Sequence, residues 1–171
     1  MTHQLYLMRH GQAGVRGSYA DDRLRPLTDE GRARTLNAGR ALKRLGVRPS
    51  AILTSPLVRA HQTAEIVADA LGLSERLEIL DSLAIGSDPS ELLRDLLAAF
   101  ESAGDDLGEP ILAVGHEPDL SIFVSSLISA DATARVRVKK GAIIQLQLQE
   151  SGEATLKSLL PPKTLDLLGA R

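Results

Sequence analysis

The chain has 171 residues, a formal net charge of −2 and 43% hydrophobic residues, so we expect a single soluble domain over residues 1–171. Nucleic acid is excluded as an expected partner, because the chain has no excess of positive charge and only 2% aromatic residues on which bases could stack. The absence of cysteine excludes disulfides, thiolate metal sites and a cysteine nucleophile.

The N-terminus shows no targeting or membrane pattern. Met1 to Gln4 lead directly into an apolar strand, without a basic segment followed by an apolar segment of signal length. No apolar run approaches the length that spans a membrane. Since the lack of cysteine also agrees with a reducing compartment, we expect a cytoplasmic protein without a membrane partner.

The first elements along the chain are a buried strand, a loop and an amphipathic helix. Leu5–Arg9 reads as the strand and ends at a His-Gly turn, and residues 12–27 have no periodicity and read as the loop. Thr28 is placed to cap the helix, whose apolar residues recur every three or four positions until Gly46 ends it.

A second strand and helix follow. Ala51–Thr54 is the predicted strand. Ser55 and Pro56 predict the helix start, with a capping hydroxyl followed by proline at the first helical position, and Gly72 predicts its end. Leu77–Leu80 is a candidate minor strand.

The second half of the chain continues the alternation. Asp88 begins a capping arrangement before a helix that reaches Phe100. The remaining predicted elements are a buried strand at Ile111–Val114, a helix opened by Pro118, and strands at Ala142–Gln149 and 154–160 that pair as a hairpin about Ser151-Gly152. Alternating elements of this kind predict an α/β fold with a mainly parallel central sheet and helices on both faces.

Polar residues of a related kind follow three of the predicted strands. Arg9 and His10 end the first, Arg59 lies one turn into the helix after the second, and His116 follows the third. Sites in open α/β sheets form at the carboxyl ends of the strands. We therefore expect these four side chains to converge.

Histidines among arginines suit phosphoryl transfer. Guanidinium groups stay charged and present paired donors to phosphoryl oxygens, and neutral imidazole is a competent nucleophile. A metal site at the two histidines is a weaker alternative, because nearby arginines would repel a cation. The other two histidines, His3 and His61, are expected to be incidental.

The motifs resemble the histidine phosphatase superfamily, also called phosphoglycerate mutase-like. Leu7-Met8-Arg9-His10-Gly11 resembles its RHG signature, and residues 27–31 and 55–64 resemble its LTxxG and SPxxRAxQTA segments. Val114-Gly115-His116 resembles the segment of its second catalytic histidine. The compact chain, without the long insertions of the mutases, is most similar to the SixA-type phosphohistidine phosphatases.

The resemblance implies a three-layer α/β/α sandwich and a phosphatase in which His10 is phosphorylated. Arg9, Arg59 and His116 would complete the phosphate pocket, and no metal or organic cofactor is implied. Arg25 would join the pocket, because Arg25-Pro26-Leu27-Thr28 is similar to a SixA-type segment in which an arginine does so.

One departure concerns the general acid. Many superfamily phosphoesterases carry a glutamate after the second helix, but the corresponding Leu80–Gly86 contains none. Asp22 and Asp81 are the candidate substitutes, each with the simpler interpretation of a surface acid. Phosphohistidine has an activated P–N bond and makes a weaker demand for an acid than an ester does.

Three functions follow from these patterns. The first is removal of phosphate from phosphohistidine on a partner protein, such as a phosphotransfer domain in a signalling relay. The second is hydrolysis of a small phosphomonoester in the same pocket. The third is a non-catalytic phosphate-binding module, against which the complete set of pocket residues argues; the oligomeric state stays open.

Overall fold

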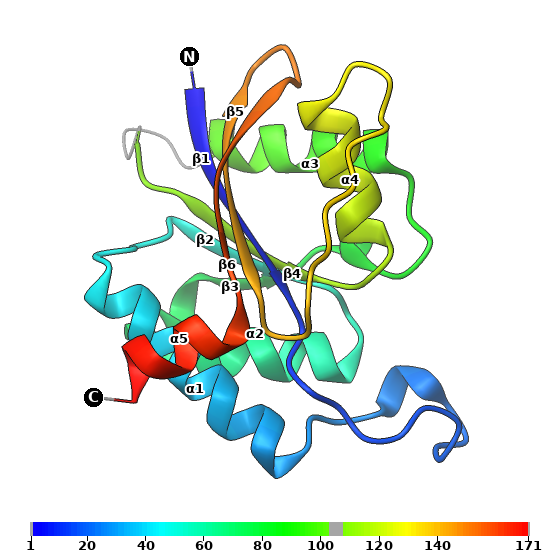
Figure 1. Cartoon of the computed structure of the whole chain (residues 1–171), viewed down its shortest axis with the longest axis vertical. Coiled ribbons are helices and arrows are strands. Elements are labelled where there is room, and N and C mark those ends of the chain that lie inside the picture. Colours follow the sequence, from blue (N-terminus) through cyan, green and yellow to red (C-terminus); the bar gives the residue numbers. More distant parts are fainter. Residues whose placement is uncertain (1, 103–107, 171) are drawn as a thin grey trace.

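Residues 2–102 and 108–170 are described by the computed structural model, whose arrangement Figure 1 shows. Six strands form one sheet. They are β1 (Thr2–Arg9), β2 (Ala51–Thr54), β3 (Leu77–Ile79), β4 (Ile111–Gly115), β5 (Ile143–Gln149) and β6 (Ala154–Leu160). The predicted strands are therefore all present, with β1 three residues longer at its start than expected.

The sheet has the order β3-β2-β4-β1-β5-β6. The pairs β3–β2, β2–β4 and β4–β1 are parallel, whereas β5 is antiparallel to both of its neighbours. The predicted hairpin joins β5 to β6, with Gly152 at a φ of +88° in its turn. The carboxyl ends of β1, β2 and β4 consequently meet at one edge of the sheet.

Helices cover both faces of the sheet, and this confirms the predicted α/β/α sandwich. Side chains alternate between the faces of a strand, so Leu5 and Leu7 pack in one core and Tyr6 and Met8 in the other. The first core contains α3 and α4, and the second contains α1, α2 and α5 (Figure 1). The helices are α1 (Asp29–Arg44), α2 (Val58–Leu71), α3 (Pro89–Ser102), α4 (Asp119–Ile128) and α5 (Pro162–Gly169).

Several helix ends follow the local rules. The Thr28 hydroxyl accepts a hydrogen bond from the amide of Gly31 and so caps α1. Gly72 ends α2 at a φ of +74°, a conformation that glycine adopts without strain. The Asp88 carboxylate accepts from the amide of Ser90 at the start of α3.

The predicted start of the second helix is wrong by two residues. α2 begins at Val58, Leu57 occupies the capping position without a side-chain cap, and Pro56 lies outside the helix. The Ser55 hydroxyl instead contacts His116, 2.8 Å away. The Ser55 hydroxyl is thus hydrogen-bonded to the residue that follows β4, and the chain bends before α2 begins.

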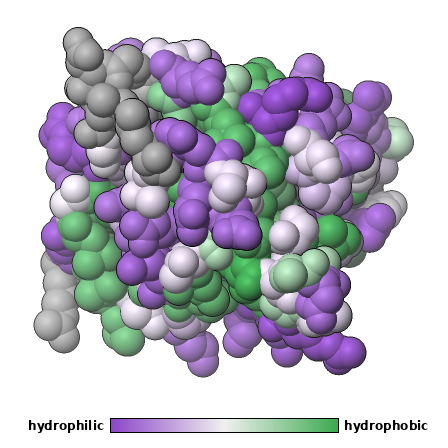
Figure 2. Space-filling model, turned by 90° about the horizontal axis from the view of Figure 1, so that it is seen from above, coloured by the Kyte–Doolittle hydropathy of each residue, from purple (hydrophilic) through white to green (hydrophobic). Residues whose placement is uncertain are grey.

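Two elements were not predicted from the sequence: α5, and a 3-10 turn, η1 (Asp22–Leu24), inside the predicted loop. Two further short 3-10 turns are η2 (Ser74–Arg76) and η3 (Asp81–Leu83). Among the helices in the described ranges, none is long and apolar enough to cross a membrane. Seen from the end where β1 begins, hydrophilic and apolar side chains intermingle and form no single broad apolar face (Figure 2).

Candidate active site

A cavity of about 530 Å³ lies where β1 and β4 end, and we call it the central cavity. Arg9 and His10 reach it from β1, Arg59 from the first turn of α2, and His116 from the residue after β4. The parallel strands bring these side chains together from distant parts of the sequence. The wall includes Arg9, His10, Arg25, Arg59, His116 and Lys140.

His10 presents one particular nitrogen to the central cavity. Its Nδ1 lies 2.7 Å from the carbonyl oxygen of Gly11, and a carbonyl can only accept, so Nδ1 carries the proton and donates it. The lone pair of the neutral ring is therefore on Nε2. A buried imidazole in this tautomer is prepared to act as a nucleophile through Nε2.

The second histidine is held by a hydroxyl. His116 Nε2 lies 2.8 Å from Ser55 Oγ, which also accepts a hydrogen bond from the amide of Leu57. The Ser55 oxygen keeps a second lone pair, so the hydroxyl can donate to His116 Nε2 or accept from it, and the ring proton is on Nδ1 when Ser55 donates. His116 Nδ1 is buried and has no partner among the described residues, so in that tautomer it is a donor available to a bound oxyanion.

Both histidines are neutral at neutral pH. Burial, together with the positive charges of Arg59, Arg9 and Arg25, lowers the pKa of His10 to about 3, although the Gly11 carbonyl opposes the shift. Burial lowers the pKa of His116 to about 3 as well, with His10 and the same arginines adding to the effect. Their ring centroids are 5.1 Å apart, so one phosphoryl group could contact both.

Asp22 holds two of the arginines in place. Its carboxylate accepts from Arg25 Nε at 2.8 Å and pairs with Arg59 Nη2 at 3.3 Å, while its backbone carbonyl accepts from Arg59 Nη1 at 2.9 Å. The hydrogen bond from Arg25 and the charge of Arg59 lower the pKa of the Asp22 carboxyl. The two guanidinium groups are thereby oriented before any anion enters.

Arg59 is a buried charge and Arg9 a half-buried one, and both are only partly satisfied. Arg9 donates through Nη1 to the carbonyl of Val138 at 2.9 Å, but the Nε atoms of Arg9 and Arg59 have no partner among the described residues. Burial lowers the pKa of both groups, although guanidinium stays charged at neutral pH. Uncompensated buried charge is costly, and an oxyanion in the central cavity would offset that cost.

A threonine hydroxyl and a glycine support the turn that carries His10. The Thr63 hydroxyl accepts from the amide of Gly11 at 3.0 Å and donates to the carbonyl of Arg59 at 2.7 Å. A Cβ at Gly31 would lie 2.0 Å from the carbonyl oxygen of Gln12, so only glycine lets α1 approach the backbone that follows His10.

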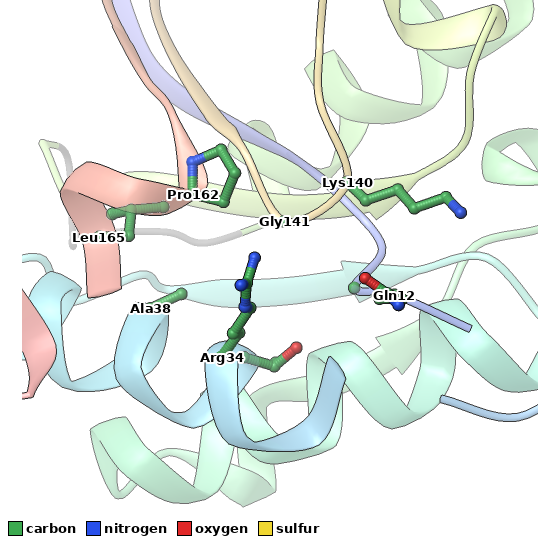
Figure 3. Close-up of a pocket in the computed structure, with 9 residues that line it drawn as sticks. Gln12, Arg34, Ala38, Lys140, Gly141, Pro162 and Leu165 are labelled. Carbon is green, nitrogen blue, oxygen red and sulfur yellow. The ribbon is translucent and has the colours of Figure 1, made fainter. Parts of the chain in front are cut away.

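A much smaller cavity of about 30 Å³ lies behind the same turn. Figure 3 shows Arg34 reaching from α1 toward Gly141, and Lys140 extending on the side where Gln12 lies, away from Pro162. This volume has room for one or two water molecules. The central cavity is therefore the candidate for binding a substrate.

Comparisons with known proteins place the chain in a family. Residues 5–84 match the family described as Histidine phosphatase superfamily (branch 1). Phosphohistidine phosphatase SixA of Escherichia coli is 30% identical over 168 residues, which are 98% of this chain and 99% of that protein. The chain belongs to the histidine phosphatase superfamily. It is a phosphatase of that superfamily, as the sequence motifs predicted.

Solved structures agree with this placement. The structure of the protein histidine phosphatase SixA complexed with tungstate has a TM-score of 0.84 and 30% identity, and the match covers 95% of this chain and 99% of that one. A phosphoglycerate mutase from Bacillus anthracis has a TM-score of 0.75 at 16% identity, covering 99% and 97% of the two chains. The second match shows the shared fold alone, and that fold is phosphoglycerate mutase-like.

The two candidate acids of this phosphatase lie in different surroundings. Asp22 lines the central cavity, but its lowered pKa and its two arginine partners make it a poor proton donor. Asp81 is exposed and is not among the described residues that line the cavity. Of the predicted set, the structure therefore brings Arg9, His10, Asp22, Arg25, Arg59 and His116 together and leaves Asp81 apart.

Sequence reasoning missed Glu117 and Lys140, which also line the central cavity. Glu117 directly follows His116, so the rule that sites form at strand ends could have indicated it. Its carboxylate accepts from the Ser121 hydroxyl at 2.6 and 2.7 Å. Lys140 precedes β5 and carries no local signal, because its position depends on the sheet.

Proposed function

We propose that this phosphatase removes the phosphoryl group from phosphohistidine on a partner protein, such as a phosphotransfer domain, through an intermediate on His10. The observation that carries the proposal is the tautomer of His10, with Nδ1 bound to a carbonyl and Nε2 unprotonated in a cavity walled by arginines. The similarity to SixA, which is described as a phosphohistidine phosphatase, supports it.

The first step transfers the phosphoryl group. His10 Nε2 attacks phosphorus, the bond from phosphorus to the substrate imidazole breaks, and the departing nitrogen takes a proton from solvent water, which the second step returns. Arg9, Arg25 and Arg59 would face the phosphoryl oxygens, and His116 Nδ1 would donate a hydrogen bond to one of them. The similar SixA structure is a complex with tungstate, which like phosphate is a tetrahedral oxyanion.

The second step returns the enzyme to its starting state. Water attacks the phosphoryl group on His10, the P–N bond breaks, and Nε2 recovers its lone pair while phosphate and a proton are released. Division into two displacements replaces one difficult step with two easier ones. Neutral His10, with its pKa of about 3, is available for the next cycle across the neutral pH range.

The ionised state of Asp22 favours phosphohistidine over an ester. An alkoxide leaving group needs a nearby acid, whereas the imidazole of phosphohistidine is a better leaving group. The carboxyls that line the central cavity in the described residues are Asp22, which is held ionised, and Glu117. A site without a dedicated proton donor therefore suits a P–N substrate.

A small phosphomonoester is the second candidate substrate, and Glu117 is the observation in its favour. Its carboxyl reaches the same cavity from the residue after His116 and could donate the proton that an ester requires. Under this alternative His10 keeps its role as nucleophile, and only the leaving group changes.

A rate comparison separates the two candidates. Purified protein would be given a phosphotransfer domain that carries phosphohistidine and, separately, sugar phosphates, nucleotides and p-nitrophenyl phosphate. We expect kcat/KM for phosphohistidine to exceed that for any alkyl phosphate by at least about 100-fold, which corresponds to about 3 kcal/mol. Efficient hydrolysis of alkyl phosphates that is lost in Glu117→Gln would select the second candidate instead.

A further inference from the structure

A long groove leaves the central cavity along α4. A hollow of about 600 Å³ adjoins the cavity and shares Arg9, Gln12, Glu117 and Lys140 with its wall. A third hollow of about 540 Å³ shares Ser121 and Val136 with the second. We call the second and third hollows together the α4 groove, and it lies between the start of α4 and residues 132–140.

One wall of the α4 groove is a chain segment with alternating exposure. Val138 is buried, whereas Arg135, Arg137 and Lys139 are exposed. Burial that alternates at every second residue is typical of an extended chain, in which residues two apart are about 6.5 Å from each other. The three cations therefore span about 13 Å. Figure 1 shows the segment running beside α4 toward the end of β1.

These cations have no carboxylate partner among residues 2–102 and 108–170. Arg34, which also lines the groove, differs from them because it pairs with Glu30 and Asp166. The carboxylate of Glu117, in the same wall, accepts from a serine hydroxyl, and its charge acts to raise the pKa of Arg9 against the burial that lowers it, so it offsets one of the positive charges. The groove therefore offers several charges that the chain itself does not neutralise.

The positive charge of the groove is continuous with that of the central cavity. Arg9 lines both, and its Nη1 donates to the carbonyl of Val138 in the cationic segment. Lys140 also lines both, and burial together with Arg9, Arg25 and Arg59 lowers the pKa of its amine. Such mutual repulsion between cations would be relieved by carboxylates bound along the groove.

We infer that the α4 groove is a docking surface for the phosphorylated partner protein, and that it selects a partner with carboxylates beside its phosphorylated side chain. The inference rests on the proposed function. A row of about 13 Å is longer than a small phosphoester needs but matches several side chains on a protein surface. The lining residues include no aromatic ring on which a nucleic-acid base could stack, so the chemistry favours an acidic protein.

Binding of short peptides tests the inference separately from the proposed function. The peptides carry either a non-hydrolysable phosphohistidine analogue or phosphoserine, each flanked by glutamates or by glutamines. Wild-type protein should bind the glutamate-flanked peptides at least about 10-fold more tightly at low salt, and the preference should shrink as salt rises. Preference for the phosphohistidine analogue over phosphoserine is a separate readout that bears on the proposed function alone.

The decisive variant is Arg135→Glu/Arg137→Glu/Lys139→Glu. We expect its preference for flanking glutamates to fall below about 2-fold. The control Arg40→Glu/Lys43→Glu/Arg48→Glu reverses three exposed cations at the C-terminal half of α1 and beyond it, on the other face of the sheet, and should keep the wild-type preference. If the charge-reversed variant does not fold, Arg135→Gln/Arg137→Gln/Lys139→Gln should still reduce the preference.

Three results would overturn the inference. The first is equal binding of glutamate-flanked and glutamine-flanked peptides by wild-type protein, and the second is a charge-reversed variant that keeps the wild-type preference. The third is a single-stranded oligonucleotide that binds wild-type protein more tightly than the glutamate-flanked peptides and loses that affinity in the variant, which would assign the groove to nucleic acid.

Discussion

His10 and His116 carry the same imidazole group, but each ring contacts a different neighbouring atom, through a different nitrogen. The Gly11 carbonyl can only accept, so it keeps the proton of His10 on Nδ1. The Ser55 hydroxyl contacts His116 Nε2 and leaves His116 Nδ1 without a partner among the described residues. The proposed mechanism uses His10 as the nucleophile and, with Ser55 donating to Nε2, His116 Nδ1 as a hydrogen-bond donor; both rings are buried and neutral.

Ser55→Ala tests the role of the hydroxyl. The proposed mechanism requires Ser55 to donate to His116 Nε2 and so to keep the ring proton on Nδ1. Loss of the hydroxyl should therefore lower kcat by about 10- to 100-fold, with a smaller change in KM. Steady-state kinetics on phosphohistidine would measure this. Ser82→Ala is the matched control, because Ser82 is also a buried serine but its hydroxyl has no partner among the described residues. Equal losses in the two variants would contradict the assigned role.

Some site residues could be predicted from the sequence because a strand end sets their position, and others could not because the folding of a loop sets it. Arg9, His10 and His116 adjoin strand ends, where the local pattern and the topology rule act together. The role of Asp22 could not be read from the sequence, since it depends on the loop folding back so that its carboxylate meets Arg59. Asp22 therefore changes from candidate acid to the residue that orients two arginines.

At the scale of elements, predictions succeeded where a residue acts on its own neighbours. Thr28 caps α1 through an amide three residues away, and Gly72 ends α2 through its own backbone conformation. α5 has a local start signal in Pro162, its first residue, but it is only eight residues long and it packs on α1, which the local sequence does not reveal. Gly169 packs so closely on α1 that a Cβ there would lie 2.0 Å from the Asn37 carbonyl oxygen.

The contact between α1 and the backbone that follows His10 gives a second prediction. In Gly31→Ala the new methyl would meet the Gln12 carbonyl oxygen, so the helix or the turn must move. We expect a loss of about 1–3 kcal/mol in the free energy of unfolding, and a lower kcat because Gln12 is two residues from His10. Urea unfolding measures the first. Arg32→Ala, at an exposed position in the same turn, should change neither.

For the whole molecule, the buried histidines make stability depend on pH. In the folded state the pKa of each is about 3, whereas the ordinary value in an unfolded chain is about 6.5. The contribution of the two neutral histidines to the free energy of unfolding is complete above pH 6.5. It is lost as the pH falls toward 3, because the histidines of the unfolded chain take up protons at a higher pH than those of the folded chain. Carboxyls with a lowered pKa, such as Asp22, lose their contribution to the free energy of unfolding only below about pH 4.

Between pH 7 and pH 5 the free energy of unfolding should therefore fall by about 2 kcal/mol for each of the two histidines. His10→Asn removes one of these groups, so its decrease over the same range should be about 2 kcal/mol smaller than that of wild type. Urea unfolding at several pH values measures both curves. Parallel curves for wild type and His10→Asn would show that the pKa of His10 is the same in the folded and unfolded states, contrary to this prediction.

The central claim is that the phosphoryl group is bonded to Nε2 of His10 before it is transferred to water. The most direct measurement is to quench the reaction with phosphohistidine substrate under alkaline conditions and to locate the phosphoryl group by peptide mapping. We predict phosphorylation of the peptide that contains His10, and neither phosphorylation nor turnover in His10→Ala. A phosphoryl group on His116 instead, or full turnover by His10→Ala, would contradict the mechanism.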